Sequence, residues 1–110
     1  MIRRVSSGAI VIGGQTYEAP IALTPDGLIE ALSPPAIEDL EVDHFATLLS
    51  TDPEMIILGT GDRNVFPPRE LTFALARKGI GLEVMDTPAA ARTFNVLAGE
   101  GRRLAALLYV

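Results

Sequence analysis

The sequence predicts an α/β fold in three layers, with a mixed central β-sheet, an N-terminal β-hairpin and a C-terminal β-α-β-α-β unit. One observation is that apolar runs of strand length alternate with two segments of helical periodicity; the runs are residues 55–58, 82–85 and 104–109. Unbroken apolar strands separated by helices are typical of a sheet covered on both faces. A second observation is Gly13-Gly14, which supplies the positive φ angles of a tight hairpin turn within the β-rich stretch 9–17.

Composition limits the classes of protein that fit. The chain has 110 residues, 48% of them hydrophobic, and a mean hydropathy of +0.31, so we expect one folded domain over residues 1–110. No apolar run approaches the roughly 20 residues of a membrane span, and the first residues lack a signal-peptide core, which favours a cytoplasmic location. The chain has no cysteine and one histidine, so we expect no disulfide, no metal site and no cofactor.

Charge is distributed unevenly along the chain. The formal net charge is -5, with nine acids and two arginines in residues 1–54 and five acids and seven bases in residues 55–110. Neutralising nucleic-acid phosphates requires clustered Lys and Arg, and the sequence contains no such block. We therefore expect no nucleic-acid partner.

The first half of the chain contains short elements. Residues 21–23 form an expected strand, which ends in the turn Thr24-Pro25-Asp26-Gly27. Ser33-Pro34-Pro35 interrupts regular structure, and the acidic segment 37–42 has no clear type. A short helix is expected from Asp43, as its N-cap, to Leu49, with three inward side chains: Phe45, Leu48 and Leu49.

Two longer helices follow. The first is expected to begin with Pro67 or Pro68 at its first position and to end before Gly79, with an inward face of Leu71, Phe73, Ala74 and Leu75. The second is expected to begin at Thr87 as N-cap and to end near Gly99 and Gly101, with a buried stripe of Ala90, Phe94 and Leu97. The return from Gly99 to Arg103 is short, so the last strand is either parallel or antiparallel to its neighbours.

Several blocks of the second half resemble one family. They are Ile57-Leu58-Gly59-Thr60-Gly61-Asp62-Arg63, Gly79 to Thr87, Arg92 to Leu97, and Glu100-Gly101-Arg102-Arg103. Together they resemble the domain of unknown function 498 family, whose eukaryotic members include a mitochondrial respiratory complex I assembly factor and an adipogenesis-associated protein. The resemblance implies a three-layer α/β fold with a mixed sheet, a bacterial cytoplasmic setting and no established catalytic mechanism. By analogy, the assembly-factor members suggest an interaction role near respiratory complex biogenesis.

The glycine turn after residue 58 is the first candidate site. Gly59, Thr60 and Gly61 end a strand of an open α/β sheet, where ligands usually enter. Arg63 and Arg69 follow and are placed to frame a carboxylate or a phosphate. No P-loop or dinucleotide motif is present, so a tight structural turn is the alternative, and Asp62 would then pair with one of these arginines.

Arg92 and Asn95 are the second candidate, because they share the helix face opposite the buried stripe. Asparagine lowers helix propensity, so we expect a tertiary hydrogen bond from Asn95, to the glycine turn or to residues 101–103. A merely solvated face is the alternative.

The remaining polar residues are expected to have structural roles. We expect capping by Asp86, a structural role for His44 and a solvated acidic face for Glu38, Asp39, Glu41 and Asp43, with no catalytic residues.

Two functions follow from these features. The first is a non-enzymatic interaction or assembly-factor-like protein, with an unidentified protein partner and an exposed apolar patch with polar edges. The alternative is a small-molecule or anion-binding protein, or a weak enzyme, which uses the crevice at Gly59–Gly61. We expect a monomer or a small homo-oligomer, since the apolar strand that ends in residues 107–110 must be covered.

Overall fold

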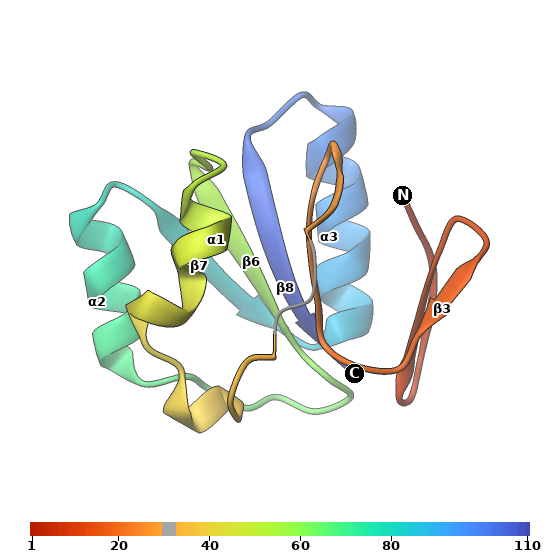
Figure 1. Cartoon of the computed structure of the whole chain (residues 1–110), viewed down its shortest axis with the longest axis horizontal. Helices are drawn as coiled ribbons and strands as arrows, with labels where there is room; N and C mark the ends of the chain where they lie inside the picture. The colour runs from red at the N-terminus through yellow and green to blue at the C-terminus, as the bar shows by residue number, and fades with distance from the viewer. Residues whose placement is uncertain (30–32) are drawn as a thin grey trace.

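The N-terminal part of the chain forms a small antiparallel sheet. The computed structural model describes residues 1–29 and 33–110. Its first strands are β1 (Ile2–Ser6), β2 (Ala9–Ile12) and β3 (Gln15–Tyr17), paired in the order β1-β2-β3 (Figure 1). The predicted hairpin is confirmed as β2 and β3; Gly13 has the expected positive φ of 60°, whereas Gly14 does not have a positive φ. β1 adds a third strand to it.

The central sheet has five strands in the order β5-β4-β8-β6-β7. They are β4 (Ile21–Thr24), β5 (Gly27–Ile29), β6 (Met55–Thr60), β7 (Gly81–Met85) and β8 (Leu104–Tyr109). β6 pairs in parallel with β7 and β8, whereas β4 pairs antiparallel with β5 and β8, so the predicted mixed sheet is confirmed.

The last strand is parallel to β6, so its antiparallel alternative is wrong. The register pairs Met55 with Leu104 and Thr60 with Tyr109, so both strands begin at the same end of the sheet. The cause is the length of α3 (Thr87–Gly99), which has 13 residues and therefore spans about 20 Å, close to the length of a six-residue strand. α3 returns the chain to the end where β6 starts, and the short connection to β8 then suffices.

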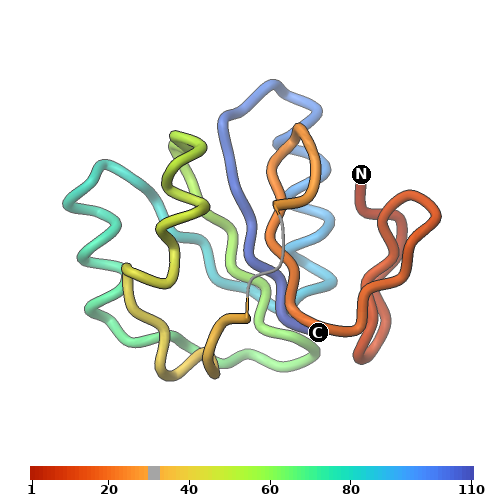
Figure 2. The backbone as a smooth tube through the Cα atoms, in the orientation of Figure 1, coloured from red at the N-terminus to blue at the C-terminus, as the bar shows by residue number. Residues whose placement is uncertain are grey.

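Side chains of the central sheet alternate between two buried clusters. Ile57, Ala106 and Leu108 point to one face, whereas Ile56 and Leu107 point to the other. α3 covers the first face, and α2 (Arg69–Arg77) with α1 (Ala46–Leu49) covers the second. The small sheet lies beside α3, and α2 lies at the opposite end of the molecule (Figure 2). This arrangement buries β8 between its own neighbours, so its apolar residues are covered by this chain.

Helix α2 differs from the expectation in two respects. Leu71 and Leu75 are buried as predicted, but Phe73 is 55% exposed, so its inward placement is wrong. Phe73 lies two residues after Leu71, which corresponds to about 200° around a helix and places it on the outer side. Pro68 is the N-cap residue, with extended ψ of 144°, so neither proline occupies the first helical position.

Helix α3 begins one residue earlier than predicted. Asp86 is its N-cap and accepts a hydrogen bond from the Ala89 N–H at 2.8 Å, so the expected capping by Asp86 is confirmed and Thr87 as N-cap is wrong. Thr87 is instead 1% exposed and turned inward. Ala90 and Phe94 of the predicted stripe are fully buried, and Leu97 is half-buried against the same cluster. Gly101 has a positive φ of 76° after the helix end.

The acidic segment is built from short turns. It contains the 3-10 helices η1 (Ile37–Asp39) and η2 (Val42–Phe45), which lead directly into α1. Asp43 lies inside η2, so its predicted capping role is wrong. The Glu41 N–H at the start of η2 donates to Nδ1 of His44 at 2.9 Å, which gives His44 a structural role. Phe45 and Leu48 are fully buried, so this segment is anchored to the core.

Candidate functional site

The glycine turn at the end of β6 is a junction between three elements. The Gly61 N–H donates to Oγ1 of Thr87 at 2.7 Å, and the Thr87 N–H donates to the Gly61 carbonyl oxygen at 2.8 Å. The Thr87 hydroxyl donates in turn to the carbonyl oxygen of Tyr109 at 2.6 Å. One buried threonine thus holds the end of β6, the start of α3 and the end of β8 together.

The space beside this turn is filled. A Cβ atom at Gly59 would lie 2.8 Å from Oγ1 of Thr87 and 2.9 Å from Cδ2 of Leu108, which is closer than real Cβ contacts. The Thr60 hydroxyl lies 2.7 Å from the Arg63 carbonyl oxygen and 3.2 Å from that of Met85, and so ties the turn to the end of β7. Glycine at position 59 allows the sheet and α3 to approach closely.

The charged residues after the turn do not pair as expected. Oδ2 of Asp62 accepts a hydrogen bond from the Ser7 hydroxyl at 3.0 Å. Within residues 1–29 and 33–110, the ion pairs are Arg102–Glu54 and Arg103–Asp52, so the expected pairing of Asp62 with Arg63 or Arg69 is wrong. The physical reason is tertiary: the turn between β1 and β2 brings Ser7 to Asp62. Arg63 and Arg69 are exposed.

Asn95 fastens the small sheet to α3. Its Nδ2 donates to the carbonyl oxygen of Ile2 at 2.8 Å, and the Ile2 N–H donates to its Oδ1 at 3.2 Å. The expected tertiary hydrogen bond is confirmed, but the partners proposed for it were wrong. The side-chain amide pairs with both backbone groups of one β1 residue, as a neighbouring strand would.

A groove with arginine side chains lies beside this contact, between β1 and α3. Its volume is about 200 Å³, and it is lined by Ile2, Arg3, Arg4, Val5, Pro88, Ala91, Arg92 and Asn95. The pairing of β1 with β2 is irregular between Ile2 and Arg4, and this bulge leaves both Arg3 and Arg4 exposed at the groove. Sequence reasoning missed Arg3 and Arg4, because a bulge leaves no signal in the alternation of residues.

The structure thus divides the predicted site residues. Arg92 and Asn95 line the arginine groove, and Gly61 lines an adjacent groove of about 190 Å³ that shares Val5 and Pro88 with it. Neither groove is lined by Arg63 or Arg69.

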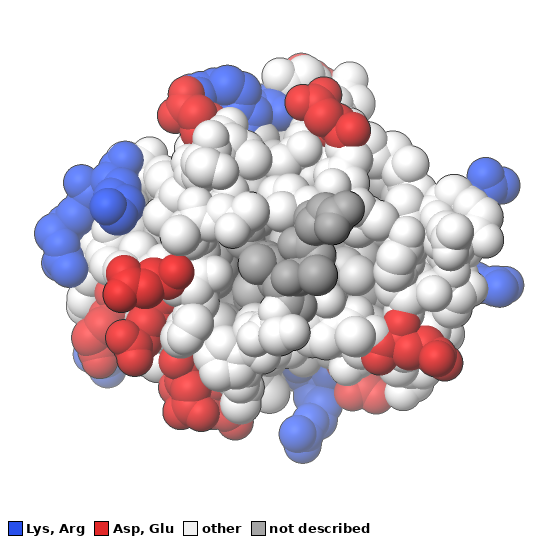
Figure 3. Space-filling model, viewed as in Figure 1, with Lys and Arg blue, Asp and Glu red and all other residues white. Residues whose placement is uncertain are grey.

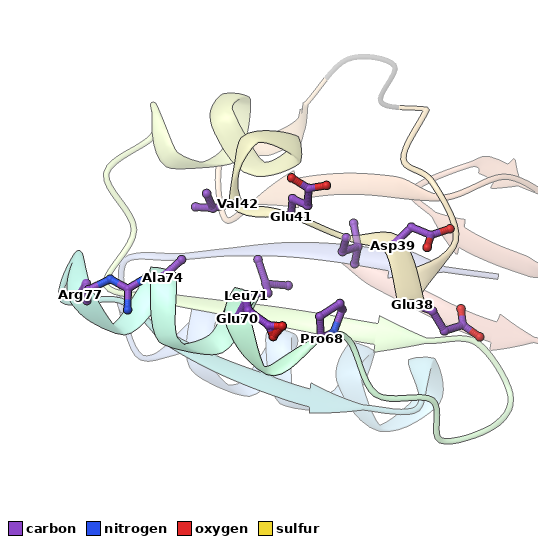
Figure 4. A pocket seen from close by; sticks show the side chains of 10 residues that line it. Glu38, Asp39, Glu41, Val42, Pro68, Glu70, Leu71, Ala74 and Arg77 are labelled. Carbon is purple, nitrogen blue, oxygen red and sulfur yellow. The ribbon is translucent and has the colours of Figure 1, made fainter.

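A larger groove lies between α2 and the segment of η1 and η2; we call it the α2 groove. Its volume is about 530 Å³, and it is lined by Glu38, Asp39, Leu40, Glu41, Val42, Pro68, Glu70, Leu71, Ala74 and Arg77 (Figure 4). Acidic side chains gather on this side of the molecule, where Figure 3 shows red atoms around α2 and the segment before α1. Sequence reasoning treated these acids as a solvated face and did not place them opposite α2.

Two aromatic side chains are exposed near the same helix. Phe66 is 74% exposed in the connection before α2, and Phe73 is 55% exposed on α2 itself. The other two phenylalanines, Phe45 and Phe94, are fully buried in the core. We call the surface of Phe66, Arg69 and Phe73 the α2 face. All three residues are exposed.

Among the described residues, two titratable groups have shifted pKa values. Burial raises the pKa of Tyr109 to about 12, and the negative charge of Glu38 adds to this; the Tyr109 hydroxyl donates to the Pro35 carbonyl oxygen at 2.7 Å. The hydrogen bond from Arg102 holds the pKa of Glu54 below its ordinary value. Both groups support the fold: Tyr109 joins the end of β8 to the chain before η1, and Glu54 accepts hydrogen bonds from Arg102 and Arg103, which lie just before β8.

The fold and its grooves define a class: a small three-layer α/β domain with a five-stranded mixed sheet and a three-stranded accessory sheet. Residues 2–109 match the family described as "Protein of unknown function (DUF498/DUF598)", and the chain belongs to this family. The family resemblance drawn from the sequence is therefore confirmed. Within the described residues, no helix has both the length and the apolar character needed to cross a bilayer.

Three similar proteins illustrate the family. The solution structure of a Xanthomonas campestris protein has 38% identity and a TM-score of 0.92, over 100% of this chain and 83% of that one. The "13 kDa major membrane protein" of Francisella tularensis is 26% identical over 92% of this chain and 83% of its own length. The "NADH dehydrogenase [ubiquinone] 1 alpha subcomplex assembly factor 3" of Bos taurus is 33% identical over 94% of this chain and 56% of its own length.

Proposed function

We propose that this protein is a non-enzymatic interaction domain with an assembly-factor-like role, and that it docks a client protein through the α2 face. The observation that carries the proposal is the exposure of Phe66 and Phe73, 74% and 55% respectively, in a chain whose other phenylalanines are fully buried. Covering a large apolar side chain is worth about 1.5–3 kcal/mol, so a partner that buries both rings gains substantial free energy.

The composition of the α2 face agrees with this role. Aromatic side chains and arginine are enriched at the centres of protein interfaces and account for much of their binding energy. Arg69 lies four residues before Phe73, so both occupy one side of α2. Phe66, Arg69 and Phe73 thus come from one short stretch of chain that leads into α2 and runs along it.

The relatives support the same reading. The bovine relative is named as an assembly factor, and this chain spans 56% of its length. We propose by this analogy a client that takes part in building a respiratory complex.

We also propose a cytoplasmic site of action. This predicts that the protein stays in the supernatant when a lysate of the source cell is centrifuged at high speed. Recovery in the membrane pellet would contradict it.

The test uses Phe66→Ala/Phe73→Ala as the variant and Val96→Ala as the control. Val96 is 60% exposed but lies on α3, on the other side of the central sheet. Tagged proteins are used to capture the client from the source cell, the client is identified, and its affinity is measured with purified components. We expect the double variant to bind at least about tenfold more weakly, since 1.4 kcal/mol corresponds to a factor of ten. Equal affinities for all three proteins would contradict the proposal.

A second candidate function is the binding of a small anion, and the arginine groove favours it. Arg3, Arg4 and Arg92 line a groove of about 200 Å³ next to the groove at Gly61, and its lining among the described residues contains no acid. Arginine recognises carboxylates and phosphates through paired hydrogen bonds. Titration with inorganic phosphate should shift the amide resonances of residues 2–5 and 91–95, and Arg92→Ala should remove the effect while Lys78→Ala leaves it intact. Identical titrations for both variants would exclude this candidate.

A further inference from the structure

We propose that the α2 groove binds a basic, amphipathic segment of the client protein. This inference rests on the proposed function, and it adds the chemistry of the partner at a surface next to the α2 face. The supporting observation is that the α2 groove has apolar side chains on its floor and acidic side chains on its rim.

The floor of the groove is apolar. The accessible apolar surface comes from Val42, Pro68 and Ala74, which are half-buried; Leu40 and Leu71 also line the groove, but each is 1% exposed. These side chains come from both walls, α2 and the segment of η1 and η2, as Figure 4 shows. A segment that lies in the groove therefore meets an apolar surface along its inward side.

The rim is acidic. Glu38, Asp39 and Glu41 come from one wall and Glu70 from the other, and Arg77 lies at the far end of the groove (Figure 4). Within the described residues, the ion pairs shorter than 4.0 Å involve neither these carboxylates nor Arg77. Four carboxylates around one groove produce a negative potential that attracts cations and repels acidic partners.

The spread of these acids argues for a peptide instead of a metal ion. In the part of the chain that the structure describes, no cluster of three or more His, Cys, Asp or Glu side chains could hold a metal. A volume of about 530 Å³ with an apolar floor and a charged rim fits a segment whose apolar and basic side chains lie on different sides. The occupant is therefore a Lys- or Arg-rich amphipathic stretch.

The experiment follows backbone amide resonances of the whole protein during titration with two short synthetic peptides. One alternates leucine with lysine, and in the other glutamate replaces each lysine. We expect shifts at residues 38–42 and 68–77 with the basic peptide only, and a weaker affinity at higher salt. Binding of the acidic peptide with equal affinity, or shifts that lie outside these residues, would overturn the inference.

A matched pair of variants separates the groove from the overall negative charge. Glu38→Gln/Glu70→Gln removes two carboxylates from the rim, and Glu83→Gln/Glu100→Gln removes two exposed carboxylates elsewhere. The first variant should bind the basic peptide about tenfold more weakly than the second, as expected for the loss of charge contacts. Equal affinities would show nonspecific attraction and overturn the inference.

The same variants distinguish this inference from the proposed function. Client capture that is lost with Phe66→Ala/Phe73→Ala but unchanged with Glu38→Gln/Glu70→Gln would overturn the basic-segment inference and leave the interaction role standing. Capture that is insensitive to the phenylalanine variant, together with specific basic-peptide binding in the groove, would overturn docking through the α2 face and support the inference.

Discussion

Thr87 connects three elements through a single hydroxyl group. It accepts from the Gly61 N–H and donates to the Tyr109 carbonyl oxygen, and its side chain is 1% exposed. Thr87→Val keeps the shape but leaves both backbone groups without this partner, so we expect it to lower the free energy of unfolding by about 1–3 kcal/mol. Urea unfolding followed by circular dichroism measures this loss. Thr87→Ser, which retains the hydroxyl, is the control; equal stability of the Val variant and the natural protein would contradict this account.

Because of Tyr109, the free energy of unfolding depends on pH in the alkaline range. Its pKa is raised from 10.0 to about 12 in the folded protein, chiefly by burial. Between these values the unfolded chain has lost the phenolic proton and the folded chain retains it, so stability is fully present below pH 10 and is lost as the pH rises toward 12. Tyr109→Phe lacks this titration.

The measurement for Tyr109 is thermal unfolding at several pH values. The variant should be less stable near neutral pH, because it loses the hydrogen bond to the Pro35 carbonyl oxygen. The difference in stability between the two proteins should narrow above pH 10, because only the natural protein has the phenol whose loss of a proton favours the unfolded chain. A difference that stays constant from pH 8 to pH 11 would contradict the shifted pKa.

At the scale of elements, the contact between β1 and α3 holds the accessory sheet in place. Asn95→Ala removes both hydrogen bonds to Ile2, so we expect faster hydrogen exchange at the amides of β1 and β2 and a stability loss of about 1–3 kcal/mol. Arg92→Ala, on the same helix face, is the control and should leave exchange unchanged. Faster exchange spread evenly over the central sheet would show that Asn95 supports the whole fold instead of this contact.

Element type was predictable because burial imposes a period on the sequence. Apolar runs indicated β6, β7 and β8, and the spacing of Ala90 and Phe94 indicated α3. Gly13 indicated the turn of the hairpin. Features set by distant contacts were not predictable. Asn95 required a tertiary partner, but nothing local identifies Ile2, which is 93 residues away. The same applies to the bulge beside Arg3 and to the meeting of Glu70 with the segment of η1 and η2 across the α2 groove.

At the scale of the whole molecule, the two sides of the central sheet differ in charge. The α2 side has the acidic groove, and the α3 side has the arginine groove. This separation does not follow the division of charge along the sequence, because the two arginines of the acidic residues 1–54, Arg3 and Arg4, line the arginine groove. Opposite charge on opposite sides gives a partner one preferred orientation, because a mismatched approach is repelled.

The central claim is that a client protein docks on the α2 side of this domain. The most direct measurement is the affinity of the purified client for the natural protein, for Phe66→Ala/Phe73→Ala and for Val96→Ala, by calorimetry at one salt concentration. The account predicts binding at least about tenfold weaker for the double variant alone, because Phe73 lies on α2 and Phe66 in the connection before it, and both rings are exposed. The same affinity for all three proteins, or a loss confined to Val96→Ala, would contradict it.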